Sequence, residues 1–206
     1  MLPFPLKNLI DKLSNLPGLG QRSATRLAFH LLNEPKEEIL ALAQALKDLP
    51  EKTKTCCQCF NLTDGANLCL ICADPKRRQN LICVVEDILD IIPLERTRQF
   101  EGVYHVLGGL ISPAEGLTPD KLHIRELAGR IKNLITPGTS PETPETTEII
   151  LALNLTVEGD TTYLYLEKLL APFKIKITKL NRGLSTGSNL EYADENTLLN
   201  ALKFRH

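Results

Sequence analysis

The sequence contains no tryptophan, and aromatic residues make up only 5% of its 206 positions. This scarcity argues against a protein that binds single-stranded nucleic acid mainly by stacking bases on aromatic rings. The charges nearly cancel, with 24 basic and 25 acidic residues, so the chain lacks the basic excess that produces indiscriminate nucleic-acid binding. Any contact with DNA must therefore come from local groups of basic residues.

Long apolar runs are also missing, although 43% of the residues are apolar. No stretch approaches the roughly 18 consecutive apolar residues that a membrane-spanning helix requires. Near the N-terminus, Lys7 and Asp11 interrupt the stretch in which a secretory signal would need an unbroken apolar core. We therefore expect a globular, cytosolic protein without membrane contact.

Cysteine is abundant by contrast, and five of the six cysteines fall within the seventeen positions from Cys56 to Cys72. Disulfides are rare in the reducing cytosol, where clustered thiols are more often metal ligands or redox pairs. The spacing is a doubled C-x2-C with nine residues between the pairs, and each pair can offer two thiolates to one tetrahedral ion. The predicted ligands are Cys56, Cys59, Cys69 and Cys72. We expect one structural zinc ion, because four cysteines leave no coordination position for a reacting water.

Other features of this region fit the same interpretation. Asp64 and Gly65 form a turn signal between the cysteine pairs, which would bring the second pair back to the first. A redox-active site needs one C-x2-C beside a βαβ unit, so two facing pairs do not match it. We expect Cys57 to be a spare thiol and Cys83 to be a buried core residue. A set of unligated core thiols is the alternative.

A glycine hairpin is predicted between two amphipathic helices near the N-terminus. The segment LPGLG places Gly18 and Gly20 two positions apart, so that backbone N–H groups can point toward a phosphate. Arg22 and Arg26 follow at a spacing of four, which puts both on one face of the second helix. This arrangement suits sequence-independent contact with the DNA backbone. It resembles the helix-hairpin-helix of DNA repair proteins, and an ordinary turn between helices is the alternative.

The flanking residues extend this prediction. We expect Leu27, Ala28 and Leu31 to face the core of the N-terminal region. The next helix, from Pro35 to about residue 49, carries apolar residues at helical spacing, which predicts packing inside the chain or against a second subunit. The basic run at 76–78 is expected to be solvated, with contact to DNA as the alternative.

After residue 80 the pattern changes to apolar strands that alternate with amphipathic helices. The predicted strands cover residues 81–86, 102–108, 148–154 and 174–180, and helices are expected from Asp87, His123 and Thr161. Alternation of this kind predicts a mostly parallel sheet covered by helices. The Pro/Thr-rich segment at 135–147 is predicted to be a mobile surface loop.

Functional groups of such a sheet collect at the carboxyl ends of its strands. The first predicted strand ends at Glu86, and the third runs into NLTVEGDTT, residues 154–162. This pairing resembles the Toprim domain of topoisomerases and primases. In its catalytic members the turn reads D-P-D-R-E-G-E, and the first two aspartates hold magnesium with the upstream glutamate. Asn154 and Thr156 stand at those two positions here, which predicts a Toprim fold without catalysis.

The order of these parts is similar to that of the bacterial recombination mediator family RecR, and the resemblance covers nearly the whole chain. It is carried by LPGLGQRSATRLAFHLL, the doubled C-x2-C, ICVVED, LN-x-T-x-EGD and LEYAD. The implied fold class is α+β and multi-part: a helix-hairpin-helix at 1–53, a C4 zinc finger at 54–79, an α/β Toprim domain with a mostly parallel sheet at 80–178, and a C-terminal oligomerisation segment at 179–206.

The resemblance also implies a function. Members of the family are non-enzymatic DNA clamps, assembled from dimers into a homotetrameric ring. They act with RecO and RecF to displace single-strand-binding protein at gaps and to load the RecA recombinase. For this chain the resemblance implies a cytoplasmic, nucleoid-associated protein whose DNA contacts are Gly18, Gly20, Arg22 and Arg26.

Three acidic residues, Glu86, Glu158 and Asp160, remain from the Toprim pattern. We expect this acidic cluster to dock a basic partner such as RecO, because exposed carboxylates attract a positive protein surface; weak magnesium binding is the alternative. Two rival functions remain open. One is a residual Toprim nuclease that uses these carboxylates with magnesium, and the other is an adaptor that bridges partners without binding DNA itself.

Overall fold

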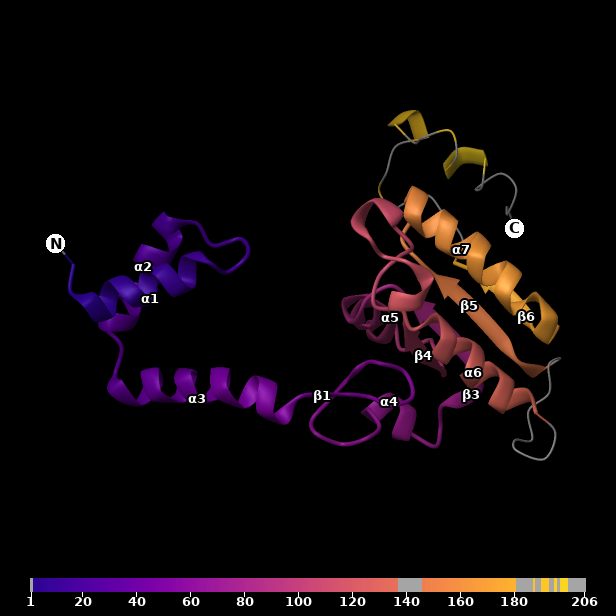
Figure 1. Ribbon diagram of the computed structural model, residues 1–206, viewed down its shortest axis with the longest axis horizontal. Helices are drawn as coiled ribbons and strands as arrows, with labels where there is room; N and C mark the ends of the chain where they lie inside the picture. Colours follow the sequence, from indigo (N-terminus) through magenta and orange to yellow (C-terminus); the bar gives the residue numbers. More distant parts are fainter. Residues whose placement is uncertain are drawn as a thin grey trace. The chain divides into compact units, whose positions relative to one another are not determined.

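The computed structural model describes residues 2–136 and 146–180, and, in the C-terminal segment, residues 187, 190–192, 195 and 197–199. The chain forms two compact units, Met1–Thr53 and Lys54–His206 (Figure 1). Most of the predicted loop at 135–147 and most of the predicted C-terminal oligomerisation segment lie outside the described residues. Within the described ranges, no helix has the length and apolarity needed to cross a membrane.

Three helices form the first unit: α1 (Phe4–Ser14), α2 (Gln21–Leu32) and α3 (Lys36–Lys52). Ile10 of α1 packs against Ala24 and Ala28 of α2, and all three side chains are almost fully buried. The prediction that Leu27 faces the core is wrong, since this side chain is 39% exposed. The two alanines lie one turn apart and form the buried stripe of α2, which turns Leu27 outward.

The apolar side of α3 remains uncovered. None of its residues is buried, and Leu42, Leu46 and Leu49 are among its exposed apolar side chains. A groove of about 420 Å³, lined mainly by apolar residues of α1, α2 and α3, lies inside the first unit. Of the two kinds of packing predicted for this helix, internal burial is therefore not observed.

The second unit begins with a small cysteine-rich element. Strands β1 (Lys54–Thr55) and β2 (Leu62–Thr63) form an antiparallel pair, and the short helix α4 (Leu70–Ala73) follows. Gly65 has φ 94°, a left-handed conformation that favours glycine. The predicted turn therefore lies between the two cysteine pairs.

A four-stranded sheet forms the rest of this unit. Its strands are β3 (Arg78–Val85), β4 (Gly102–Val106), β5 (Glu148–Ala152) and β6 (Lys176–Lys179), in the order β4-β3-β5-β6. All three pairings are parallel, which confirms the predicted sheet. The longer connections are η1 (Ile88–Asp90) with α5 (Ile91–Arg96), α6 (Ile124–Ile135) and α7 (Val157–Leu170).

Helices cover both faces of the sheet (Figure 1). On one face, Ile82 and Val84 of β3 pack with residues of α6 and α7 such as Leu127 and Leu166. On the other face, Cys83 and its neighbours pack against α5 and the cysteine-rich element. The alternation along β3 follows from the period of two in a strand, and it explains the nearly continuous apolar run in the sequence.

Helix α7 begins at Val157, four residues before the predicted start at Thr161. Thr156 is its N-cap residue, and the Thr156 Oγ1 atom accepts the Gly159 N–H at 3.1 Å. Gly159 lies so close to the preceding turn that a Cβ atom would come within 1.9 Å of the Asn154 carbonyl oxygen. The glycine that suggested an extended turn is thus required by close packing in the first turn of a helix.

The outer edge of β4 is closed by groups from other elements. The Val106 N–H donates to the Cys59 carbonyl at 2.9 Å, and the Val106 carbonyl is 3.0 Å from His123 Nδ1. Two residues earlier, on the same side of the strand, the Tyr104 carbonyl accepts a hydrogen bond from Arg130 at 2.7 Å. The cysteine-rich element and α6 therefore satisfy backbone groups that an edge strand would otherwise expose.

Candidate functional site

The four cysteines predicted as metal ligands lie together. Their Sγ atoms are all within 4.8 Å of one another, and all four side chains are buried. A tetrahedral zinc ion with bonds of about 2.3 Å holds its sulfurs about 3.8 Å apart, so the cluster can receive one ion with little movement. Among the residues that the structure describes, no other group of three or more His, Cys, Asp or Glu side chains is arranged for a metal ion.

Backbone hydrogen bonds shape each cysteine pair into a tight knuckle. In the first, Phe60 adopts φ 65° and its N–H donates to the Cys56 carbonyl at 3.1 Å. The Cys56 N–H donates to the Asn61 carbonyl at 2.7 Å. In the second, Cys69 is the N-cap residue of α4, and its Sγ accepts the Cys72 N–H at 3.5 Å. An N–H group that donates to a cysteine sulfur, as that of Cys72 does to Cys69, favours the thiolate form that metal binding requires.

The pKa values of these thiols show opposing influences. Burial raises the pKa of Cys69 to about 11. Burial also acts against ionisation of Cys56, but backbone hydrogen bonds outweigh it and lower the pKa to about 7. The pKa of Cys59 lies well above its ordinary value because of its hydrogen bond with Cys72 and its burial. A bound divalent cation would lower these thiol pKa values, since it stabilises the thiolate form.

The two remaining cysteines differ in their surroundings. Cys57 is exposed, and its N–H donates to the Asn67 carbonyl at 3.0 Å. Cys83 is 3% exposed in β3, and burial raises its pKa to about 12. The prediction of a buried core role for Cys83 is confirmed.

The glycine hairpin connects α1 to α2. Gly18 has φ 80°, and the Leu19 N–H donates to the Leu16 carbonyl at 3.1 Å, which closes a tight turn. Gly20 is the N-cap residue of α2. Arg22 and Arg26 follow on the first two turns, and both are exposed. Neither arginine forms an ion pair with a residue in the described part of the chain.

The carboxylates of the Toprim pattern are placed less closely. Glu86 is at the end of β3, while Glu158 and Asp160 are exposed in the first turn of α7. The three do not form one of the metal-compatible groups of the described residues. Glu86 Oε2 accepts a hydrogen bond from Asn154 Nδ2 at 2.6 Å. The residue at the first aspartate position is thus a donor to Glu86.

Arg77 belongs to the basic run that we predicted to be solvated, and for this residue the prediction is wrong. Its guanidinium donates to both carboxylate oxygens of Glu95, at 2.9 and 2.5 Å, and to the carbonyl of Phe100. The Tyr104 hydroxyl donates to the same carboxylate at 2.7 Å. Burial acts against ionisation of Glu95, but these donors outweigh it and lower its pKa. The network fastens α5 to the sheet.

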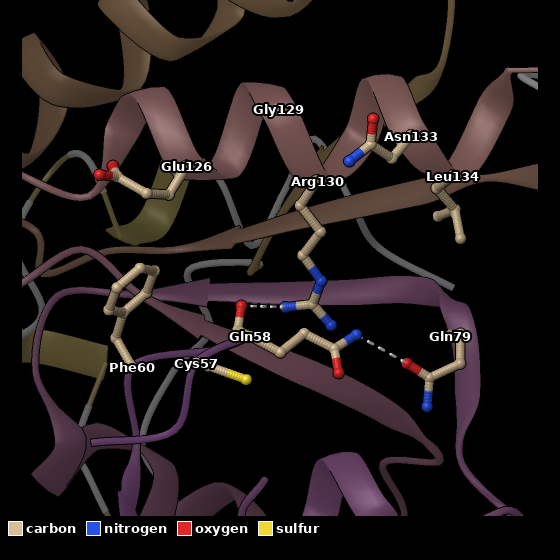
Figure 2. A pocket seen from close by; sticks show the side chains of 9 residues that line it. All are labelled: Cys57, Gln58, Phe60, Gln79, Glu126, Gly129, Arg130, Asn133 and Leu134. Carbon is tan, nitrogen blue, oxygen red and sulfur yellow. Dashed lines mark hydrogen bonds between the residues drawn. The ribbon is translucent and has the colours of Figure 1, made fainter. Parts of the chain in front are cut away.

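A pocket of about 690 Å³ lies between the first knuckle, the start of β3 and α6 (Figure 2). Arg130 extends from α6 toward Gln58 at its wall, and Gln58 also contacts Gln79 across 3.3 Å. Arg130 was not singled out from the sequence. The sequence did contain one indication of its role. Arg130 lies three residues after the buried Leu127 and next to the buried Ile131, on the apolar side of an amphipathic helix.

A further contact joins the first knuckle to the sheet. The Phe60 ring stacks on the His123 ring, with centroids 3.7 Å apart and planes 8° from parallel. His105 Nε2 is 2.8 Å from the His123 carbonyl oxygen. Burial lowers the pKa of His105 to about 4, so its imidazole is neutral near pH 7.

These features define a Toprim protein that also carries a helix-hairpin-helix and a four-cysteine centre. Family models agree with this class: Toprim domain matches residues 80–181, RecR helix-hairpin-helix matches 6–49, and RecR C-terminal matches 183–206. The chain belongs to the RecR family of recombination proteins. The predicted family and fold are thereby confirmed.

Full-length relatives support the assignment. Recombination protein RecR of Cutibacterium acnes is 49% identical over 205 residues, which cover 100% of this chain and 96% of the relative. The proteins of the same name from Myxococcus xanthus and Thermosynechococcus vestitus are 45% and 47% identical, over 100% and 98% of this chain and 98% and 94% of the relatives. The similarity thus includes every part discussed above.

Proposed function

We propose that the chain is a non-enzymatic recombination mediator that binds the DNA backbone and acts with RecO and RecF. In this role it displaces single-strand-binding protein at gaps and loads RecA, in the cytoplasm and in association with the nucleoid. The observation that carries the proposal is the hairpin at Gly18 and Gly20, followed by the exposed Arg22 and Arg26 one turn apart. Exposed guanidinium groups beside backbone N–H groups can neutralise phosphates without reading bases.

The other parts receive structural roles in this proposal. Residues 1–53 bind DNA, 54–79 form a zinc finger, 80–178 form the Toprim domain and 179–206 join subunits. We assign zinc to the four-cysteine centre because four buried thiolate donors with no open position suit structural Zn²⁺. Zinc there would join two knuckles that are far too small to fold on apolar burial alone.

Assembly into a dimer and then a tetrameric ring is supported by the apolar surface of the first unit. Leu46 and Leu49 of α3 are 65% and 64% exposed, beside the apolar groove. Apolar surface of this kind marks an interaction site more often than a solvated face. Light scattering after size exclusion should show a smaller assembly for Leu46→Glu than for the wild type, whereas an unchanged mass would count against this surface.

The acidic residues of α7 are proposed to dock the basic partner RecO. Glu158 and Asp160 are exposed at the start of the helix, where a positive protein surface can reach them. Glu158→Lys should weaken RecO binding by at least tenfold at low salt, with Glu167→Lys, further along the same helix, as the control. Equal RecO affinity in the two variants would remove this role from Glu158.

DNA binding itself is tested by fluorescence anisotropy across a salt series, without partners. The Arg22→Ala/Arg26→Ala variant should bind more weakly, and its slope of log affinity against log salt should be smaller by about 2, one for each lost phosphate contact. The matched control is Lys36→Ala/Lys47→Ala, which removes two exposed cations from α3. The control should keep the wild-type slope.

Two further measurements separate the rival functions, one in the same salt series and one with plasmid DNA. An adaptor without its own DNA contacts would show no binding at any salt in any of these proteins. A residual nuclease would nick plasmid DNA in the presence of magnesium. Two contacts support absence of catalysis: Glu86 accepts a hydrogen bond from Asn154, and Thr156 caps α7. Asn154 and Thr156, which stand at the two aspartate positions, offer no carboxylate for magnesium chemistry.

A further inference from the structure

Arg130 extends from α6 to the place where the first knuckle meets the edge of the sheet (Figure 2). Its Nη1 donates to the Tyr104 carbonyl at 2.7 Å and makes a longer contact of 3.4 Å with the Gln58 carbonyl. Gln58 lies between Cys56 and Cys59, so the second contact is to the backbone of the knuckle itself. One guanidinium thus connects α6, β4 and a predicted metal-binding loop.

The other terminal nitrogen, Nη2, is buried and has no hydrogen-bond partner among the described residues. Arg130 also forms no ion pair with a carboxylate in the part of the chain that the structure describes. A guanidinium stays charged at every physiological pH, and a buried charge is costly unless another charge compensates it. Arg130 is half-buried, and the buried side of its guanidinium therefore favours a neighbouring negative charge from another kind of group.

The contact with Gln58 points to the four cysteines as that group, because Gln58 lies between Cys56 and Cys59. Burial lowers the pKa of Arg130, and after burial the largest influences are the charges of Cys72, Cys59, Cys56 and Cys69, all of which oppose that lowering. Four thiolates around one divalent cation leave a net charge of about −2, in a place shielded from water. A buried negative centre and a buried positive guanidinium each cost free energy alone. Placed next to each other, their opposite charges compensate.

We propose that Arg130 is the counter-ion of the four-cysteine metal centre and positions its first knuckle against β4. Arg130 acts on the metal through the ligands and does not bind it. This inference rests on the proposed zinc site. It adds that the metal affinity and the thiolate-to-metal absorption of that site depend on a residue of α6 in the Toprim domain. This residue lies 58 positions after the last predicted ligand.

The test compares Arg130→Met, Arg130→Lys and the control Arg125→Met, which removes an exposed arginine from the same helix. Zinc affinity is measured in the full chain by competition with a chromogenic chelator. Cobalt is substituted for zinc, and the thiolate-to-cobalt absorption is recorded. Arg130→Met should lower zinc affinity by about 10- to 100-fold, the range typical of groups that support metal ligands. The thiolate-to-cobalt band should move to longer wavelength, because the sulfurs lose a neighbouring positive charge.

Arg130→Lys keeps the charge and loses the planar fork, so it should retain part of the affinity and show a smaller spectral shift. This variant also serves if Arg130→Met does not fold. Affinities and spectra of the Met and Lys variants that equal those of the wild type would overturn the inference. A wild type that takes up neither zinc nor cobalt would overturn the metal site as well, so the two failures are distinguishable.

Discussion

The Asn154 side chain donates a hydrogen bond to the Glu86 carboxylate over 2.6 Å, and this contact joins the carboxyl ends of β5 and β3. In catalytic Toprim domains an aspartate stands at the position of Asn154, and two facing carboxylates repel each other unless a cation lies between them. The amide removes that need, because it offers a donor where a second negative charge would repel Glu86. The contact thus stabilises the sheet end without metal.

Asn154→Asp should restore the repulsion. We expect a loss of about 1 kcal/mol in the free energy of unfolding at neutral pH, since a hydrogen bond to a charged group is replaced by a like-charge pair. Magnesium should recover part of the loss. Urea unfolding with and without magnesium measures both effects, and Asn154→Ala, which adds no charge, should not respond to the ion. A variant as stable as the wild type without magnesium would contradict this account.

Gly159→Ala should destabilise the protein by about 2–4 kcal/mol, because the new Cβ atom would clash with the Asn154 carbonyl and force the start of α7 to move. Gly129→Ala in α6 is the matched control, since no atom of the described residues outside the neighbouring backbone of its own helix lies within 4 Å of the added methyl group. It should be neutral or stabilising by about 0.5–1 kcal/mol, as expected for alanine in a helix. Similar losses in both variants would refute the packing argument.

Cys69→Ser should lose bound zinc and unfold at a lower temperature, because metal binding and folding are coupled at such sites. Cys57→Ser is the control, since this neighbouring cysteine is exposed and outside the cluster. Zinc content by atomic absorption and thermal unfolding would be measured for both. A chelator should lower the unfolding temperature of the wild type and of Cys57→Ser, but have little effect on Cys69→Ser. Equal zinc content in the two variants would exclude Cys69 as a ligand.

His105 predicts a pH dependence of stability. Burial lowers its pKa to about 4, while a hydrogen bond with His123 opposes the shift and the charge of Arg130 adds to it. Between the ordinary value of about 6.5 and 4, the unfolded chain binds a proton that the folded chain does not. Stability should therefore fall by up to about 3 kcal/mol as the pH decreases through this window. The contribution of neutral His105 to stability should be fully present above about pH 6.5.

His105→Gln removes this titration, and its free energy of unfolding should fall less steeply over the same pH range. Protonation of the cysteine ligands also destabilises acidic samples, but it affects the wild type and the variant alike, so the difference between the two curves isolates the imidazole. Parallel curves from pH 7 to 4 would show that His105 is not the group responsible.

The parts that could be predicted from the sequence depend on local spacing. The doubled C-x2-C, the apolar run that contains Cys83 and the hairpin at Gly18 each involve residues that are close in the chain, so their geometry follows from turn and strand periodicity. The start of α7 was missed because Gly159 normally indicates a turn, and its close approach to Asn154 is a tertiary contact.

Long-range contacts account for most of what was missed. Arg77 pairs with Glu95, and Arg130 reaches Tyr104 and Gln58, over 18, 26 and 72 positions of the chain. No short pattern encodes such contacts. A charged residue on an apolar helix face, as Arg130 is, gives the only local indication, because it shows that a partner must exist without showing which one.

The hydrogen bond from Val106 to Cys59 has a consequence for the state of the metal-free chain. In the described part of the sheet, β4 is one edge strand, and its outward backbone groups are covered by the first knuckle together with His123 and Arg130. At the other edge, β6 is short and has lysines at both ends. Lysines discourage strand addition by a neighbouring molecule. The β4 edge has no such charged residues and depends on the knuckle. If the four cysteines hold zinc as proposed, loss of the metal should expose an apolar strand edge and promote aggregation.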